Sequence, residues 1–202
     1  MRTIAAHLEM SLDGVVDSPE RWAHAYFSPD LLEAAQAGMA DTDTILFGRR
    51  TYEEFATIWP NQPADDPFAG FLNDTPKLVA SNTLQELPWG PAELVTGDAA
   101  EAVAELKSKP GGDVIILGSS TLVGSLLRAG VLDMLELFIV PVLIGNGKRL
   151  FDAPDQVPLR LVESRSFDNG VLAVRYGRGQ APPHEGEAPP HEREAPPHEG
   201  KE

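Results

Sequence analysis

Two segments of the chain place a glycine between an apolar run and a stretch that opens with basic or hydroxyl residues. They read Ile45-Leu46-Phe47-Gly48-Arg49-Arg50-Thr51 and Ile115-Ile116-Leu117-Gly118-Ser119-Ser120-Thr121. Each pattern is typical of a buried strand that turns sharply into a helix. Glycine lets a ligand approach the backbone closely, and the free N–H groups and dipole of a helix N-terminus attract phosphate. The two junctions therefore predict an anion site.

Arg49 and Arg50 favour the same interpretation, because guanidinium groups form charge-assisted hydrogen bonds with phosphoryl oxygens. Neither segment is a GxGxxG or Walker A motif. Two such junctions fit an extended ligand with two phosphate-bearing ends. A dinucleotide lying across the carboxyl ends of the central strands is the natural candidate. The alternative is that the glycines only allow close helix packing and that the arginines are solvated.

The composition excludes several other kinds of function. The chain has 202 residues, a formal charge of −15 and no cysteine. The negative charge disfavours nucleic acid and anionic membrane surfaces as partners. Without cysteine there is no disulfide, thiolate nucleophile or Cys-ligated zinc, and His7 and His24 alone make a catalytic metal site unexpected. No targeting signal or membrane-spanning run of about 20 apolar residues is present, so we expect a cytoplasmic protein.

The elements that must position the two junctions alternate between strand and helix up to residue 130. The spacing predicts strands at residues 3–8, 44–47, 77–80, 93–95, 114–117 and 134–144, the last interrupted at Pro141. It predicts helices that begin at residues 28–30, 51, 99 and 121, and a short one around Phe71. Residues 159–167 and 171–176 form a terminal hairpin around Asn169-Gly170. We expect an α/β protein in three layers: a mixed, mainly parallel central sheet with helices on both faces and an antiparallel C-terminal edge hairpin.

A composition shift divides the chain into a domain at residues 1–180 and a tail at 181–202. The tail repeats APPHEGE, APPHERE and APPHEGK, and it is too poor in large apolar side chains to form a core. We expect a solvated, polyproline-like segment. Its histidines recur every seven residues, which spreads them roughly 20 Å apart in an extended chain, too far to share one metal ion.

Several motifs, in order along residues 3–176, resemble those of a known superfamily. The run from Phe47 to Glu53 (FGRRTYE) is similar to the G-R-x-T-[WY]-E/D element of dihydrofolate reductases. Ser11-Leu12-Asp13-Gly14 is similar to the S-L-D-G opening of the riboflavin-biosynthesis reductase domain. Residues 118–122, 130–133 and 141–151 resemble that family's G-x-x-x-L, G-L-V-D-E-L and P-V-x-L-G-x-G-x-R-L-F elements. The chain is identified as a member of the dihydrofolate reductase-like superfamily, close to the RibD C-terminal domain family.

The resemblance implies a dihydrofolate reductase-like fold that binds NADPH and passes its hydride to a heterocyclic or carbonyl substrate. It implies that the cofactor is held by Gly48, Arg49, Arg50, Thr51, Ser81, Asn82, Gly118, Ser119, Ser120, Thr121 and Leu122. Family members often carry Arg at the position of Asn82, so NADH remains an alternative cofactor. Dihydrofolate reductases have Gly-Gly joined by a cis peptide at the second phosphate turn, which implies a cis bond between Gly118 and Ser119. Relatives tend to be homodimers, with strand 134–144 and the terminal hairpin as interface elements.

On the substrate side, the resemblance points to Asp13 and Glu33 as the candidate catalytic acids. Asp13 also belongs with Gly14 to the loop that closes over nicotinamide and substrate, and Trp22 and Tyr26 follow that loop as candidate stacking residues. Each has a structural alternative. Leu-Asp-Gly is ordinary turn chemistry, and aromatic residues in such a place are often core. Outside the cofactor candidates, the only basic pair is Lys148-Arg149, where Arg149 is expected to pair with a neighbouring acid.

The function that the resemblance implies is that of 5-amino-6-(5-phosphoribosylamino)uracil reductase or a related NADPH-dependent reductase. The zinc deaminase to which this reductase is commonly fused needs cysteine ligands, which the chain lacks. Hydride transfer requires few protein groups, because the cofactor carries the chemistry. Two alternatives remain open: a nucleotide-binding or interaction module without turnover, and a dihydrofolate or pteridine reductase.

Overall fold

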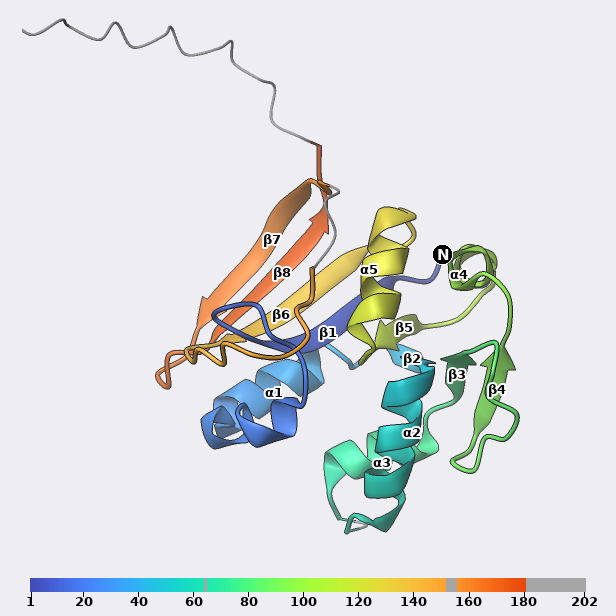
Figure 1. Ribbon diagram of the computed structural model, residues 1–202, viewed down its shortest axis with the longest axis horizontal. Helices are drawn as coiled ribbons and strands as arrows, with labels where there is room; N and C mark the ends of the chain where they lie inside the picture. Colours follow the sequence, from blue (N-terminus) through green and yellow to red (C-terminus); the bar gives the residue numbers. More distant parts are fainter. Residues whose placement is uncertain (64, 152–155, 181–202) are drawn as a thin grey trace, which may run out of the picture.

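The computed structural model describes residues 1–63, 65–151 and 156–180, so the predicted tail at 181–202 lies outside the described residues. The described strands form one sheet of eight in the order β4-β3-β2-β5-β1-β6-β8-β7 (Figure 1). The strands are β1 (Ile4–Ser11), β2 (Thr42–Gly48), β3 (Lys77–Ala80), β4 (Ala92–Val95), β5 (Asp113–Ile116), β6 (Met134–Val140), β7 (Leu159–Ser166) and β8 (Leu172–Arg178). The helices are α1 (Pro29–Ala37), α2 (Arg49–Ile58), α3 (Pro67–Asp74), α4 (Ala99–Ser108) and α5 (Ser120–Arg128), with short 3-10 turns η1 (Pro19–Arg21), η2 (His24–Tyr26) and η3 (Trp59–Asn61).

The predicted mixed sheet is confirmed. All pairs from β4 to β6 in the sheet order are parallel, whereas β8 runs antiparallel to both β6 and β7. The strand predicted at residues 134–144 is shorter than expected, because β6 ends at Val140. Pro141 has no N–H to continue the ladder. The chain beyond it turns back, and Val142 then accepts a hydrogen bond from the backbone N–H of Leu12 at 3.0 Å.

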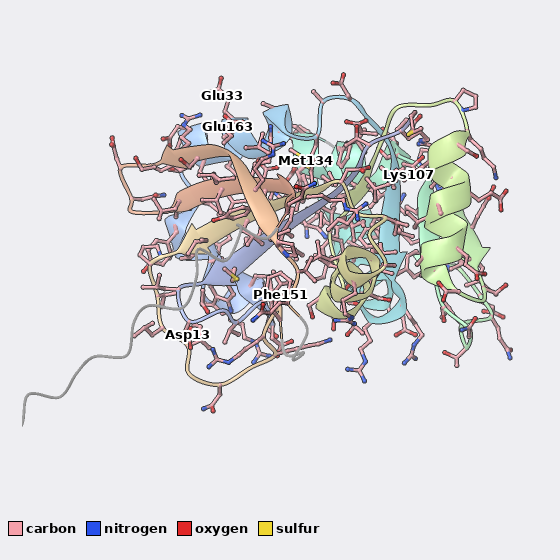
Figure 2. All side chains as sticks on the ribbon, turned by 90° about the horizontal axis from the view of Figure 1, so that it is seen from above. Asp13, Glu33, Lys107, Met134, Phe151 and Glu163 are labelled. Atoms are coloured by element: carbon pink, nitrogen blue, oxygen red, sulfur yellow. The ribbon has the colours of Figure 1, made fainter. Side chains whose placement is uncertain are left out.

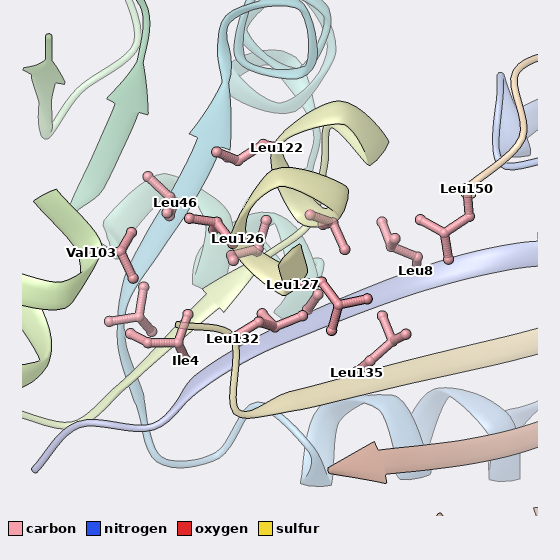
Figure 3. Packing of buried hydrophobic residues seen from close by; sticks show 14 of the residues in the cluster. Ile4, Leu8, Leu46, Val103, Leu122, Leu126, Leu127, Leu132, Leu135 and Leu150 are labelled. Carbon is pink, nitrogen blue, oxygen red and sulfur yellow. The ribbon is translucent and has the colours of Figure 1, made fainter. Parts of the chain in front are cut away.

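One face of the sheet is covered by α4 and α5 over a continuous apolar cluster (Figures 1 and 3). Strand residues of this cluster are Ile4, Ala6, Leu8, Leu46, Val114, Ile116, Leu135 and Leu137, and α5 adds Leu122, Val123, Leu126 and Leu127. The alternation along β1 and β6 follows the period of two that a strand with one face on a core requires. This cluster fixes α5 against the sheet.

The opposite face carries two separate apolar clusters instead of one. The first gathers α2 and α3 over β2 and β3 and includes Phe47, Tyr52 and Leu72. The second places α1 over β6 and the terminal hairpin and includes Leu31 and Phe138. Between them runs β1, the strand that pairs with both β5 and β6. Its side chains on this face are not large and apolar, but are those of Ala5, His7, Glu9 and Ser11.

Candidate functional site

The two strand–glycine–helix junctions lie directly against each other at the carboxyl ends of β2 and β5. The backbone N–H of Gly48 donates to the carbonyl oxygen of Gly118 at 3.0 Å. A Cβ atom on Gly48 would lie 2.6 Å from the Ser119 hydroxyl oxygen, and one on Gly118 would lie 2.8 Å from the Thr51 hydroxyl oxygen. The peptide bond between Gly118 and Ser119 is cis, as the resemblance implies. Both glycines are therefore required for the contact that brings the N-termini of α2 and α5 together.

The side chains at these helix N-termini can bind an anion. Arg49 and Arg50 are exposed in the first turn of α2, where Arg49 contacts Glu53 at 3.7 Å, and Arg50 has no ion-pair partner in the described part of the chain. At the start of α5, the Ser119 hydroxyl caps the helix by accepting from the backbone N–H of Leu122. Ser120 is half-buried at the first position of the helix. The free N–H groups of a helix N-terminus and the guanidinium groups of the first turn of α2 are donors of the kinds that bind phosphate.

Lys148 adds a third positive charge that the sequence did not assign to the cofactor site. Its ammonium group donates to the Thr121 hydroxyl oxygen in the first turn of α5. The loop that carries it is held by backbone hydrogen bonds, from Val16 N–H to Lys148 O at 2.9 Å and from Leu150 N–H to Gly14 O at 3.1 Å. Arg149 donates to the backbone carbonyl of Asp13 rather than to a carboxylate. Only this contact between the loop and the first turn of α5, which no local pattern reveals, places Lys148 beside the glycine junctions.

Ser81 and Asn82 lie just past the end of β3 and form a turn. The Ser81 hydroxyl accepts from the backbone N–H groups of Thr83 and Leu84 at 3.2 and 3.0 Å. The Asn82 side chain accepts from the Gly97 N–H at 2.7 Å and donates to its carbonyl at 3.4 Å. The predicted adenosine-side turn is thus tied to the loop that precedes α4.

Asp13 is engaged as a hydrogen-bond acceptor on both carboxylate oxygens. One oxygen accepts from the Ser11 hydroxyl at 2.7 Å and from the Ile144 N–H at 3.1 Å, and the other accepts from the Gly145 N–H at 2.8 Å. The Ser11 bond first, and then the two backbone bonds, lower the pKa of Asp13 to about 2. Such a group is ionised at neutral pH and is suited to fixing the first loop against residues 144–145.

The other substrate-side candidates do not join Asp13. Glu33 is exposed on α1, and Figure 2 shows Asp13 and Glu33 at opposite sides of the molecule in that view. Trp22 and Tyr26 are half-buried and pack against the cluster that contains Phe138, with the Trp22 indole N–H donating to the Asp17 carbonyl at 2.9 Å. Gly14 adopts φ +88° in the first loop. The structure therefore brings the cofactor candidates together but separates the two candidate acids.

A polar pair that the sequence did not single out lies on the face of β1 between the two apolar clusters. The Nδ1 atom of His7 lies 3.1 Å from a carboxylate oxygen of Glu136 on β6, directly opposite in register. Burial alone would raise the pKa of Glu136, but the hydrogen bond and charge of His7 and the charge of Arg175 outweigh it, so this pKa is lowered. The signal in the sequence was the alternation along β1, with Ile4, Ala6 and Leu8 facing the other way.

A surface hollow of about 570 Å³ lies between α2 and the loop after β3, with Tyr52, Glu53, Thr83 and Glu86 in its lining. None of the predicted site residues lines it. Among the described residues no three His, Asp or Glu side chains gather as a metal site would need. None of the helices in the described ranges has the length and apolar character needed to cross a bilayer.

The sheet order, the helices on both faces and the antiparallel C-terminal strands define a dihydrofolate reductase-like fold. The structure superposes on a putative riboflavin biosynthesis protein of Shewanella sp. PV-4 with a TM-score of 0.72 at 22% identity, covering 89% of this chain and 100% of that one. It superposes on an Enterococcus faecalis dihydrofolate reductase complexed with NADP(H) with a TM-score of 0.61 at 15% identity, covering 88% and 97% of the two chains.

The sequence comparison narrows this class to one family. The model of the RibD C-terminal domain matches residues 2–173. The chain belongs to the RibD C-terminal domain family. A relative in Bacillus subtilis (strain 168), the uncharacterized protein YyaP, is 28% identical over 186 residues, which cover 87% of this chain and 94% of the relative. The family and the fold are those of reductases.

Proposed function

We propose that the protein is an NADPH-dependent reductase that transfers a hydride to a heterocyclic or carbonyl substrate. The observation that carries the proposal is the direct contact of the two junctions, in which Gly48 bonds to Gly118 and the N-termini of α2 and α5 lie side by side. When bound, NADPH supplies the hydride. The protein's part is to hold the phosphates, orient the nicotinamide and exclude water.

The charged side chains suggest how the cofactor is held. The helix N-termini and Lys148 would bind the pyrophosphate, because the Lys148 ammonium group lies against Thr121 in the first turn of α5, next to the free N–H groups of that helix. Arg49 and Arg50 would bind the adenosine 2′-phosphate, which NADH lacks. Asn82 carries no charge and is already bonded to Gly97. The preference for NADPH over NADH therefore depends on the two arginines.

Titration of the intrinsic fluorescence of Trp22 and Trp59 with NADPH and NADH tests this proposal. We expect tighter binding of NADPH, and a loss of about tenfold or more in NADPH affinity in Arg50→Ala, since a hydrogen bond between charged groups contributes about 1.5–3 kcal/mol. Arg128→Ala, at the exposed C-terminal end of α5, is the matched control and should bind normally. Failure of the wild type to bind either nucleotide would contradict the proposal.

For the substrate, we propose the pyrimidine reduction for which the riboflavin-biosynthesis family is known. The assay follows NADPH oxidation with 5-amino-6-(5-phosphoribosylamino)uracil and, separately, with dihydrofolate. Turnover of the uracil compound supports the proposal. Turnover of dihydrofolate alone, together with inhibition by methotrexate, would favour the pteridine reductase. Tight NADPH binding without oxidation across both compounds would favour the binding module.

We also propose that the protein is a homodimer paired through its terminal hairpin. Almost every residue of the edge strand β7 is exposed, on both faces of the sheet, and these residues include Leu161 and Val162 at 50% and 44% exposure. An edge strand that exposes adjacent apolar side chains is normally covered, and a second copy would cover it symmetrically. Light scattering should give the mass of a dimer for the wild type and of a monomer for Val162→Lys. Leu94→Lys, on the opposite sheet edge β4, should remain dimeric.

A further inference from the structure

His7 occupies an unusual place on the sheet. It lies on β1, the strand between the α1 cluster and the α2–α3 cluster, and its side chain is only 7% exposed. One side of the ring packs against Phe138, with ring centroids 4.7 Å apart. The imidazole thus lies on the polar side of β1 between two helix-covered clusters, which is where we place the substrate.

The two ring nitrogens of His7 have different surroundings. Nδ1 bonds to Glu136, whereas Nε2 has no hydrogen-bond partner among the described residues. No side-chain nitrogen or oxygen in those residues is both fully buried and unpaired. It follows that Nε2 remains in contact with solvent although the rest of the side chain is covered. An imidazole oriented by a carboxylate at Nδ1 and open at Nε2 is the arrangement of a general acid or base.

His7 also lies near the end of β5, the strand that leads into the glycine turn. Ala5 pairs with Ile115 and Ala6 pairs with Ile116 in the parallel ladder between β1 and β5. His7 is the next residue of β1 after the last of these pairs, about one residue's rise (~3.3 Å) further along the strand. On the neighbouring strand, β5 ends at Ile116, two residues before Gly118.

Contacts around the pair hold Glu136 in place. Glu136 is 13% exposed and also receives the Arg175 guanidinium at 3.1 Å, and Arg175 in turn contacts Glu163 on β7 at 3.2 Å. The end of α1 closes over the pair, since a Cβ on Gly38 would lie 2.9 Å from the Glu136 carboxylate. Because Glu136 is fixed in this way, its hydrogen bond fixes the orientation of the His7 ring.

We propose that His7 is the proton donor of the reductase reaction and that Glu136 is its positioning residue. The inference rests on the proposed function. As the carbon of a substrate C=N or C=O bond accepts a hydride from the bound dihydronicotinamide, its nitrogen or oxygen accepts the proton from His7 Nε2. The substrate is reduced by two electrons, the nicotinamide is oxidised by two, and the imidazole regains a proton from water. Neither Asp13 nor Glu33 is needed for this step.

Acylation by diethyl pyrocarbonate, read by mass spectrometry of peptides, tests whether Nε2 is open without any substrate. We expect His7 to be acylated in the free protein, more slowly than the exposed His24, and NADPH to slow the reaction at His7 only. His24 is the internal control. If His24 reacts and His7 does not, Nε2 is not open to solvent, and the proposal that His7 donates the proton is overturned. If the fluorescence titration shows that NADPH does not bind, the proposed function is contradicted, and so is the proposed role of His7, which rests on it.

Variants then separate proton donation from a structural role. His7→Gln should bind NADPH as the wild type does but lose about 10²–10⁴-fold in kcat on the substrate that the wild type reduces, whereas His24→Gln should keep its activity. Glu136→Gln should lower kcat while leaving KM and NADPH affinity close to those of the wild type, because Glu136 positions His7 and does not itself contact the substrate. Unchanged kcat in His7→Gln would overturn the proposal. Should His7→Gln fail to fold, the acylation of the wild type still decides it.

Discussion

The two faces of β1 differ in what their side chains do. Ile4, Ala6 and Leu8 face α5 and belong to one continuous apolar cluster. The residues between and after them, His7 and Glu9, face the gap between two other clusters. Both sets come from the same eight residues and the same backbone. One strand thus anchors the fold on one face and offers titratable groups on the other.

This difference explains how a site can be rigid without being apolar. A central strand is held by ladders on both edges, to β5 and to β6. Packing of its apolar face against α5 further fixes the position of β1 in the sheet. The backbone hydrogen bonds and the apolar packing of β1 therefore also position the polar side chains on its opposite face. Functional sites on strands are held accurately in this way. Substitutions on the two faces should consequently have different kinds of effect.

The largest expected effect is a loss of stability on the apolar face. Ile4 is fully buried in the cluster under α5, so Ile4→Ala should destabilise the protein by about 2–5 kcal/mol through lost burial and a cavity. Urea unfolding at neutral pH measures this. Acylation of His7 in the folded variant should keep the wild-type rate. A variant of wild-type stability, or one in which His7 becomes freely reactive, would show that the two faces are not separable.

A smaller loss of stability is expected from a substitution in the glycine turn at Gly118, between β5 and α5. In Gly118→Ala the residue would keep φ +140°, and its Cβ would lie 2.8 Å from the Thr51 hydroxyl oxygen. We expect a loss of about 1–3 kcal/mol in stability, because an alanine is strained at such a φ, together with loss of NADPH binding as the junctions separate. Calorimetry and fluorescence titration measure the two effects.

Gly97→Ala is the matched control for this turn. Gly97 also has a positive φ, +85°, but a Cβ there would meet no atom within 4 Å. The Gly97→Ala variant should therefore lose stability through backbone strain but keep its affinity for NADPH. Equal NADPH affinity in both variants would contradict the role of the junction contact.

Much of this organisation could be predicted from the sequence, because it depends on local patterns. The strand at residues 77–80 and the helices that begin near residues 99 and 121 follow from apolar spacing and from the glycines and prolines around them, and β3 has the predicted bounds. The junctions around Gly48 and Gly118 were visible for the same reason. The glycine, basic and hydroxyl residues of each junction follow one another directly in the sequence. The order of the motifs along the chain then indicated the family.

The substrate side could not be predicted in the same way. Lys148 meets Thr121, and His7 meets Glu136, only because strands and loops far apart in the chain become neighbours. Glu33 was favoured by its place on the first long helix, but helix position does not reveal which face is exposed. Sequence alternation showed that His7 faces away from Ile4 and Leu8, yet not what lies opposite. These contacts depend on the order in which the strands pair in the sheet, and local sequence patterns do not determine that order.

Lys77 is a buried ammonium group on the same face of the sheet as His7, and its pH dependence sharpens the comparison of the two faces. Lys77 is 1% exposed; it donates to the carbonyls of Asn73 and Thr75 at 3.2 and 2.9 Å and lies over the Trp89 ring. Burial lowers the pKa of Lys77 to about 8, against a smaller opposing effect of Asp74. Every bond of this ammonium group is to the protein, so we expect it to affect stability and not catalysis.

The sign of the Lys77 effect follows from proton binding. Between about pH 8 and 10.5 the unfolded chain binds a proton that the folded chain lacks, so stability should rise with pH. The rise should be about 1–2 kcal/mol, since nearby carbonyls and water screen part of the shift. Urea unfolding of the wild type and of Lys77→Met across this range measures it, with the variant correcting for tyrosine ionisation. A rise of the same size in Lys77→Met would assign it to other groups.

The smallest effect is expected at Asp13, which lies at the solvent-facing end of the site. The pKa of Asp13 is lowered from 3.8 to about 2, so its ionised form contributes stability that is present above pH 4 and is lost as the pH falls to 2. Asp13→Asn keeps one acceptor oxygen and loses the charge, so its melting temperature should be slightly below that of the wild type at pH 7 and equal to it at pH 2. Asp17→Asn, exposed in the same loop, should match the wild type at both pH values. A difference that persists at pH 2 would mean that the Asp13 carboxylate does not hold the first loop to residues 144–145 through its charge.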